Sequence, residues 1–103
     1  MPPTRISYAA ALILHALESG CVYGFDVMET TGLPSGTVYP ALRRMEKSGL
    51  VRSNWENADA AHAEGRPRRR NYRLTASGVD ALAAARERLP LLPAASVIAP
   101  AEG

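Results

Sequence analysis

The sequence predicts a mainly α-helical domain with one small β-hairpin, and three observations support this class. Apolar residues recur at helical spacing in four segments, which are residues 4–19, 23–31, 36–48 and 76–89. Residues 50–55 and 69–74 are better strand candidates, because polar and apolar residues alternate and Tyr72 and Leu74 share a face. The length of 103 residues fits a single domain. The predicted order α-α-α-β-β-α is the plan of a winged helix-turn-helix.

The first predicted helix, residues 4–19, is apolar on two sides. One side is the core-facing stripe, which consists of Ile6, Ala10, Ile13 and Leu17. The opposite side, which would meet water in a monomer, carries Tyr8, Leu12 and His15. In so short a chain, a helix that is apolar on both sides favours contact with a partner subunit.

The second and third predicted helices are separated by a glycine- and proline-containing turn. In the second helix, residues 23–31, the expected buried side chains are Phe25, Val27 and Met28. The third helix, residues 36–48, is expected to be capped by Ser35 or Thr37. Pro40 is expected in its first turn, where a missing N–H group costs least.

The hairpin is expected to have a long, exposed tip that leads into the last helix. Residues 56–68 are small, polar or charged and include Gly65 and Pro67, so they predict a loop. Thr75 is the expected cap of the last helix, residues 76–89. The core stripe of that helix is predicted to be Val79, Leu82, Ala85 and Leu89.

Prolines mark the end of the folded part of the chain. Pro90 and Pro93 end the last helix, and the Ala/Pro-rich residues 91–103 predict a flexible tail. We therefore divide the chain into a winged helix-turn-helix domain at residues 4–75, a dimerisation helix at residues 76–90 and this tail.

The charge of the chain is unevenly distributed. Twelve Lys and Arg against ten Asp and Glu give a formal net charge of only +2. Residues 66–73, however, contain five Arg and no acidic residue, whereas the preceding residues 1–65 carry a net charge of −2. Eleven of the twelve cations are Arg, the residue best suited to bidentate contacts with phosphate and guanine. The distribution therefore points to a polyanionic partner more strongly than the net charge does.

The third helix separates apolar from cationic side chains. On a helical wheel its buried side consists of Val38, Ala41, Leu42 and Met45. Its exposed side consists of Tyr39, Pro40, Arg43, Arg44 and Lys47. Cations and a hydroxyl are the groups that contact phosphates and base edges in a DNA major groove. At the start of the helix, Ser35, Gly36 and Thr37 add free N–H groups suited to a phosphate.

The hairpin predicts a second DNA contact. Four arginines, Arg66, Arg68, Arg69 and Arg70, lie at its tip or on its return strand. Arginines on such a wing enter a minor groove or bind the DNA backbone, although this cluster alone is equally typical of a solubilising patch. Its combination with a cationic third helix favours double-stranded DNA as the partner. The alternative from another class of function is a winged-helix module that binds an acidic protein.

Several motifs resemble those of the PadR-like family of transcriptional regulators. They are Tyr23-Gly24-Phe25-Asp26, Gly36-Thr37-Val38-Tyr39-Pro40-Ala41-Leu42-Arg43-Arg44, Gly49-Leu50-Val51, Gly65-Arg66-Pro67-Arg68-Arg69 and Tyr72-Arg73-Leu74-Thr75. The resemblance implies a homodimeric repressor that binds an inverted-repeat operator and is released by a small hydrophobic or aromatic effector. It also implies that Thr37, Tyr39, Pro40 and Arg43 contact the DNA groove and that residues 66–70 form the wing.

The last helix departs from the family pattern. In family members it runs long and supplies most of the dimer contact, whereas Pro90 ends it early in this sequence. The first helix should therefore carry more of the contact between subunits. The expected interface residues are Tyr8, Leu12, His15, Val79, Leu82 and Leu89. The last helix also lacks the aromatic residues that line a ligand cavity in some relatives, and Trp55 lies on the wing strand instead, which weakens the case for an effector pocket.

The residue pattern does not indicate catalysis, a cofactor or a metal. His15, Cys21 and His62 lack ligand-like spacing, and no nucleophile elbow or phosphate-binding glycine loop is present. The single Cys excludes an internal disulfide and fits a reducing cytoplasm. The apolar run at residues 8–14 is too short for a membrane span, and Glu18 soon interrupts a signal-peptide pattern. We therefore expect a cytoplasmic protein that is not an enzyme.

Overall fold

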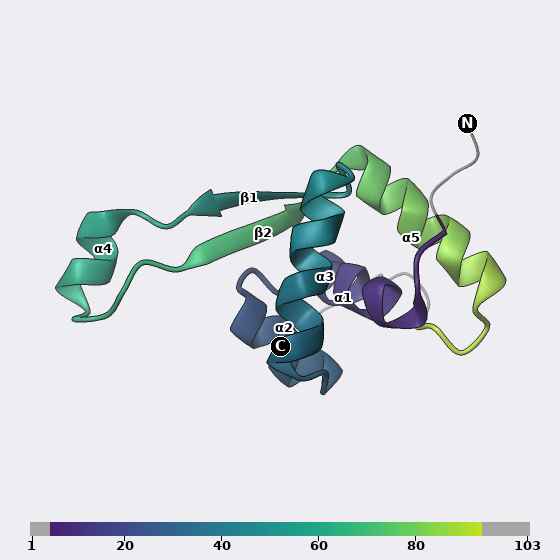
Figure 1. The fold of residues 1–103 in the computed structure, drawn as a ribbon, viewed down its shortest axis with the longest axis horizontal. Coiled ribbons are helices and arrows are strands. Elements are labelled where there is room, and N and C mark those ends of the chain that lie inside the picture. The colour runs from purple at the N-terminus through teal and green to yellow at the C-terminus, as the bar shows by residue number, and fades with distance from the viewer. Residues whose placement is uncertain (1–4, 94–103) are drawn as a thin grey trace.

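The computed structural model describes residues 5–93 and has the predicted winged helix-turn-helix arrangement (Figure 1). Three helices precede an antiparallel two-stranded sheet and a further helix follows it, while a short helix lies between the two strands. The elements are α1 (Tyr8–Glu18), α2 (Gly24–Thr31), α3 (Ser35–Lys47), β1 (Val51–Trp55), α4 (Ala58–Ala63), β2 (Arg70–Leu74) and α5 (Ala76–Arg88).

Helix α1 starts later than predicted but buries the predicted stripe. Ser7 caps the helix, since its Oγ accepts a hydrogen bond from the Ala10 N–H at 3.0 Å. Ile6 lies before the helix and is nevertheless buried, as are Ile13 and Leu17. The N-terminal segment therefore contributes to the core without being helical.

Helix α2 ends at a glycine and exposes one side chain that was expected to be buried. Gly32 has a left-handed conformation (φ 76°), and its N–H donates to the Met28 carbonyl, which closes the last turn. Val27 is fully buried and Met28 is half-buried, but Phe25 is 59% exposed. The prediction for Phe25 was wrong because so short a helix turns only one narrow face, centred on Val27, towards the core.

Helix α3 differs from the prediction at its N-terminus. The helix begins at Ser35, and the non-helical residue before it is Pro34, so neither Ser35 nor Thr37 provides the predicted cap. Instead the N–H groups of Thr37 and Val38 donate to the Pro34 carbonyl at 2.9 and 3.0 Å. Pro40 lies inside the helix rather than in its first turn. Pro40 has no N–H, so the carbonyl of Gly36, four residues earlier, lacks its usual helical donor. Because Gly36 is exposed, water can reach this carbonyl and hydrogen-bond to it.

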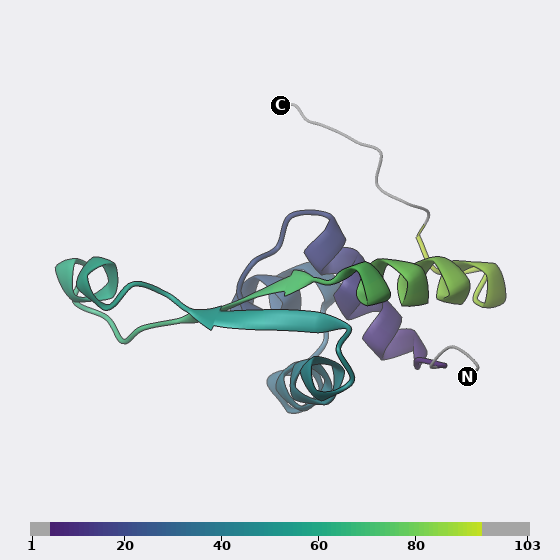
Figure 2. The same ribbon diagram turned by 90° about the horizontal axis from the view of Figure 1, so that it is seen from above.

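The two strands form a regular antiparallel ladder. The register pairs Val51 with Leu74, Ser53 with Tyr72 and Trp55 with Arg70. The Tyr72 N–H also donates to the Val22 carbonyl at 2.8 Å, which ties the return strand to the segment before α2. The hairpin is therefore held by the helical body at its base, while its far end extends away from it (Figure 2).

The tip of the hairpin, residues 56–68, is exposed as predicted, but it is not a loop throughout. It contains helix α4, which is capped by Asn57 through hydrogen bonds from the Asp59 and Ala60 N–H groups. Ala61 is 1% exposed, so the tip has a small packed interior of its own. The signal for this helix was present as an Asn followed by a segment rich in alanine, the best helix former.

Helix α5 packs on α1 through most of the predicted stripe, since Leu82 and Ala85 are buried and Leu89 packs against the core, but Val79 is not part of it. Thr75 caps it as predicted, with its Oγ1 accepting a hydrogen bond from the Gly78 N–H at 3.0 Å. Leu82 is fully buried, but Val79 is 47% exposed because the buried stripe includes Gly78 in its place. Leu92 after the helix is also buried, and the remainder of the predicted tail, residues 94–103, lies outside the described residues.

Helix α1 lies at the centre of the core and contacts α2, α3, α5 and β2. The largest fully buried side chains are Ile13, Leu14, Leu42, Leu82, Val27 and Val38. Burial of one such side chain contributes roughly 1.5–3 kcal/mol, so this cluster is the main source of stability. It fixes α3 against the body with one side free, while α4 and α5 lie at opposite ends of the molecule (Figure 1).

Candidate nucleic-acid interface

The exposed side of α3 carries the predicted cationic surface. Tyr39 is 38% exposed and Arg43, Arg44 and Lys47 are exposed, whereas the four predicted core residues of the helix are buried. Within residues 5–93, none of these three cations forms an ion pair with a carboxylate. Their charges are therefore available to a polyanion. At the start of the helix Ser35 is exposed and Thr37 is half-buried.

A close contact between α2 and α3 positions Tyr39. Gly24 is buried beneath the Tyr39 ring. A Cβ atom on residue 24 would collide with Cε1 of this ring and would lie only 2.8 Å from its Cζ and 2.9 Å from its hydroxyl oxygen. Only glycine leaves room for the ring in this position. The Tyr23-Gly24 motif thus determines where the aromatic hydroxyl of α3 lies.

Hydrogen bonds connect α3 to the hairpin. The Ser53 hydroxyl of β1 donates to Glu46 Oε2 on α3 at 2.5 Å, and Arg70 Nε on β2 donates to Ser53 Oγ at 2.9 Å. An Arg70 nitrogen also lies 3.6 Å from Glu46 Oε2. The only carboxylate at the edge of the cationic face of α3 is therefore used to orient the wing.

Arg66 closes the tip of the hairpin and does not present its guanidinium as predicted. Its two terminal nitrogens each donate to a carboxylate oxygen of Glu56 at 2.6 Å, and its Nε donates to Glu64 at 2.9 Å. The exposed fraction of the side chain is only 23%. This geometry gives Arg66 a structural role in the tip and leaves its guanidinium fewer free N–H groups than those of the other wing arginines.

Glu56 is the acceptor around which the base of the tip is organised. Besides the Arg66 guanidinium it accepts the Arg69 N–H at 2.8 Å, and its side chain is only 9% exposed. The hydrogen bonds from Arg66, and then those from Arg69, lower the pKa of the Glu56 carboxyl from 4.5 to about 2. The wing is thus held by a carboxylate that remains ionised at neutral pH.

The other three wing arginines stay exposed and stack on aromatic rings. The Arg69 guanidinium lies 4.0 Å from the centroid of the Tyr23 ring, which fastens the hairpin to the body. The Arg68 and Arg70 guanidiniums lie over Trp55, at 5.4 and 5.3 Å from the ring centroid. These cations are therefore partly ordered before any ligand binds.

A recess joins the wing to the two helices of the helix-turn-helix. It has a volume of about 290 Å³, and the residues that line it are Tyr23, Gly24, Phe25, Tyr39, Arg68, Arg69, Arg70 and Tyr72. Burial raises the pKa of the Tyr72 hydroxyl, so this group stays protonated at neutral pH. The cations of the wing and the hydroxyl of α3 thus belong to one continuous surface.

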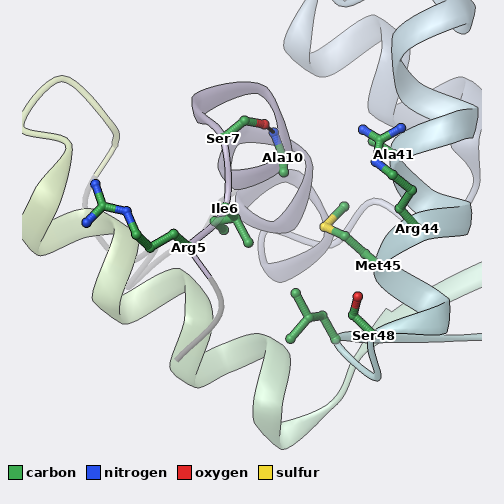
Figure 3. Close-up of a pocket in the computed structure, with 9 residues that line it drawn as sticks. Arg5, Ile6, Ser7, Ala10, Ala41, Arg44, Met45 and Ser48 are labelled. Atoms are coloured by element: carbon green, nitrogen blue, oxygen red, sulfur yellow. Dashed lines mark hydrogen bonds between the residues drawn. The ribbon is translucent and has the colours of Figure 1, made fainter. Parts of the chain in front are cut away.

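A second hollow extends the cationic surface towards the N-terminus. It has a volume of about 270 Å³ between the N-terminal segment and α3. Figure 3 shows Arg5 and Arg44 on two sides of it, with Ile6 and Met45 between them. Arg5 was not recognised as part of this surface, because a single cation before a helix carries no pattern of its own.

The predicted dimer residues fall into two groups. Tyr8 and Val79 are exposed and Leu12 and Leu89 are half-buried, so each has surface that a partner could cover. Leu82 is 0% exposed, because it fills the core of its own chain, and it has no surface left for a partner.

His15 is engaged within the chain. Its Nδ1 lies 2.8 Å from an Arg86 nitrogen, and Arg86 also forms an ion pair with Glu18 at 2.8 Å. Burial, and then the Arg86 charge, lower the pKa of the His15 ring, while Glu18 acts in the opposite direction. The ring therefore joins α1 to α5 as a neutral acceptor, in addition to any contact with a second subunit.

Residues 5–93 lack the groups for a metal site and the helix length for a membrane span. Across residues 5–93 no three His, Cys, Asp or Glu side chains are grouped so as to hold a metal ion. No helix of the same part of the chain is long and apolar enough to cross a membrane. Cys21 is half-buried with its Sγ 3.3 Å from Thr30 Oγ1, and His62 is exposed on α4.

Three helices, an extended hairpin and an α3 face whose cations form no ion pair within residues 5–93 define a winged helix-turn-helix protein of the DNA-binding class. The transcriptional regulator PadR-like family matches residues 13–84. The chain belongs to this family and is a DNA-binding transcriptional regulator, not an enzyme. None of the curated proteins matches the chain.

Solved structures have the same fold. A PadR family transcription regulator from Clostridium difficile is 30% identical, with a TM-score of 0.70 over 82% of this chain and 88% of that one. A transcriptional regulator from Clostridium thermocellum is 26% identical, with a TM-score of 0.66 over 82% of each chain. A PadR-like transcription factor from Bacteroides fragilis is 22% identical, with a TM-score of 0.67 over 79% of each chain.

Proposed function

We propose that this regulator is a homodimeric repressor that binds operator DNA with α3 in the major groove and the wing against the neighbouring backbone or minor groove. The observation that carries the proposal is the row of unpaired cations on α3, joined to the wing through Glu46, Ser53 and Arg70. A major groove accepts one helix, and Arg contacts in it discriminate between bases.

The two parts of the surface have different tasks in this proposal. Tyr39, Pro40, Arg43 and the neighbouring cations of α3 face the base edges and the phosphates beside them. The N–H groups of Ser35 and Gly36, together with the Thr37 hydroxyl, face a phosphate, since the Thr37 N–H is already bound to the Pro34 carbonyl. Arg68, Arg69 and Arg70 bind the backbone or enter the minor groove. Arg66 is left out, because Glu56 and Glu64 occupy its guanidinium.

An apolar surface on α1 and the end of α5 supports the dimer. Tyr8 on α1 is 43% exposed and Leu91 after α5 is 86% exposed. Leu12 on α1 and Leu89, the residue that follows α5, are half-buried. Exposed apolar side chains of this kind are typical of a protein–protein contact. The two recognition helices of such a dimer would lie about 34 Å apart and read an inverted repeat.

A small apolar hollow in this surface is where we place an effector. Tyr8, Leu89, Pro90 and Leu91 line a volume of about 360 Å³, which suits a small hydrophobic or aromatic molecule. A molecule bound there would lie at the subunit contact and could change the spacing of the two recognition helices. Such a change lowers operator affinity, because half-site spacing is fixed by DNA geometry.

The test is a gel-shift titration with DNA from upstream of the chain's own gene. We expect a shift at low salt, with the Arg43→Ala variant weaker by roughly 1–3 kcal/mol if Arg43 contacts a base. In vitro transcription from the same DNA should fall when the protein is added. No shift at low salt, together with capture of an acidic protein, would favour the protein-interaction module instead.

A further inference from the structure

The wing carries an exposed tryptophan between two cations. Trp55 is the last residue of β1, and its side chain is 55% exposed although tryptophan is usually buried. The Arg68 and Arg70 guanidiniums lie over its ring at 5.4 and 5.3 Å. In the described part of the chain the indole N–H has no hydrogen-bond acceptor. A donor without a protein acceptor and two cations are thus grouped at one exposed place.

The strand register places this group on the side of the hairpin that faces α3. Successive side chains of a strand point to opposite faces, so Trp55 shares a face with Ser53. Ser53 donates to Glu46 of α3, and the residue paired with Trp55 is Arg70, which lies beside the same carboxylate. The neighbouring Asn54 points to the other face. A duplex that contacts α3 would therefore meet Trp55 and not Asn54.

The stacking arrangement has a physical consequence for phosphate binding. An Arg side chain normally loses much rotamer freedom when it binds, and a guanidinium that already rests on an aromatic ring loses less. Arg68 is also fixed by a hydrogen bond from its Nε to the Glu56 carbonyl at 3.2 Å, and Arg70 by its bond to Ser53. The remaining N–H groups of both guanidiniums can still donate to a phosphate.

We propose that Trp55 is a DNA-contacting residue of the wing. Its ring orders Arg68 and Arg70 for two phosphates, and its exposed edge and N–H pack against the sugar–phosphate backbone between them. This inference rests on the proposed DNA-binding mode, and it adds an aromatic contact that is independent of sequence. It therefore contributes to affinity for all duplexes, not to the choice of operator.

Trp55 is the only tryptophan of the chain, so intrinsic fluorescence reports on this site alone. We would titrate the full chain with a labelled duplex from upstream of its own gene, and follow tryptophan emission and DNA anisotropy in the same sample. The expected result is a change in emission that saturates together with the anisotropy. Both signals should reverse when salt is added.

Two substitutions on the same strand complete the test. Trp55→Ala should weaken binding to specific and random duplexes alike, by at least fivefold, with unchanged helical content by circular dichroism. Asn54→Ala, on the opposite face, is the matched control and should bind like the wild type. If anisotropy shows binding while emission stays constant and Trp55→Ala binds equally well, the role of Trp55 is refuted and the proposed function is not. If anisotropy shows no binding at low salt, the proposed function fails.

Discussion

Individual arginines of the wing have different environments although they are neighbours in the sequence. Arg66 is bound by two carboxylates and is mostly covered, whereas Arg68 and Arg70 remain exposed over Trp55. A buried ion pair contributes little net stability, but removal of one partner leaves the other charge without compensation. Arg66 therefore maintains the wing, whereas Arg68 is the residue that we propose for DNA binding.

The Glu56–Arg66 pair predicts a specific loss of stability in acid. Because the folded-state pKa of Glu56 is about 2 and its ordinary value is 4.5, the unfolded chain takes up a proton there more readily. The contribution is present in full above about pH 4.5 and is lost as the pH falls towards 2. We expect urea midpoints of the wild type to fall over this range more steeply than those of Glu56→Gln. Parallel pH profiles for the two proteins would contradict this role of the carboxylate.

Among the elements, two close helix contacts depend on glycine for different reasons. A Cβ atom at Gly78 on α5 would collide with the backbone carbonyl of Leu50, which cannot rotate away. A Cβ atom at Gly24 on α2 would collide with the end of the Tyr39 ring, and this side chain can rotate away. The first contact holds α5 to the sheet, and the second determines the direction of a side chain in the DNA-binding surface.

Alanine substitutions should separate these two contacts. Gly78→Ala should lower the free energy of unfolding by about 3 kcal/mol or more, since overpacking against backbone exceeds the gain of about 1 kcal/mol in helix propensity. Gly24→Ala should cost less stability but weaken DNA binding, because Tyr39 is displaced. Gly36→Ala on α3 has open space around it and serves as the control. Equal stability of all three variants by urea denaturation would refute the packing account.

The sequence predicts elements well where hydrophobic periodicity and a capping residue coincide. It predicts the role of a side chain poorly where that role depends on a contact with a residue far away in the sequence. The Thr75 cap and the two sides of α3 follow from local patterns, whereas the Ser7 cap was missed because the apolar Ile6 extended the predicted helix to residue 4. Helix α4 was missed because it is short, although its asparagine cap was visible. The structural role of Arg66 could not be read from the sequence, because it depends on Glu56, which is ten residues away.

In the whole molecule, the arginine-rich wing and the apolar surface beside Tyr8 occupy different ends. The wing with α4 extends from one end, and the apolar hollow beside Tyr8 lies with α5 at the other (Figure 1). This separation allows two copies to meet through α1 and α5 while each α3 remains free to contact DNA. The proposed dimer and the proposed DNA contact are therefore compatible in one assembly.

A charge placed in the apolar surface should dissociate the dimer. Tyr8→Glu introduces a carboxylate that would have to be buried on association, which is costly without a partner charge. Sedimentation velocity should show a dimer for the wild type and a monomer for this variant. Ala60→Glu on the exposed side of α4 adds the same charge at the far end and should remain dimeric. A wild-type monomer at micromolar concentration would contradict the proposed assembly.

The DNA-binding surface itself is tested most directly by the salt dependence of binding in two matched double variants. Arg43→Ala with Arg68→Ala removes one cation from α3 and one from the wing. Arg52→Ala with Arg73→Ala removes two exposed cations that lie opposite each other on the two strands. They are on the face of the hairpin opposite Ser53 and Trp55. Both variants lose the same net charge, so a difference between them reports on position alone.

Fluorescence anisotropy with one labelled duplex over a range of salt concentrations provides the measurement. We predict that the Arg43/Arg68 variant loses at least tenfold in affinity at low salt. Its slope of log affinity against log salt should be smaller by about 1 per protomer, because Arg68 contacts a phosphate, Arg43 contacts a base, and about one counterion is released for each phosphate contact. The Arg52/Arg73 variant should match the wild type. An equal loss in both variants, or a loss only in the second, would contradict the account.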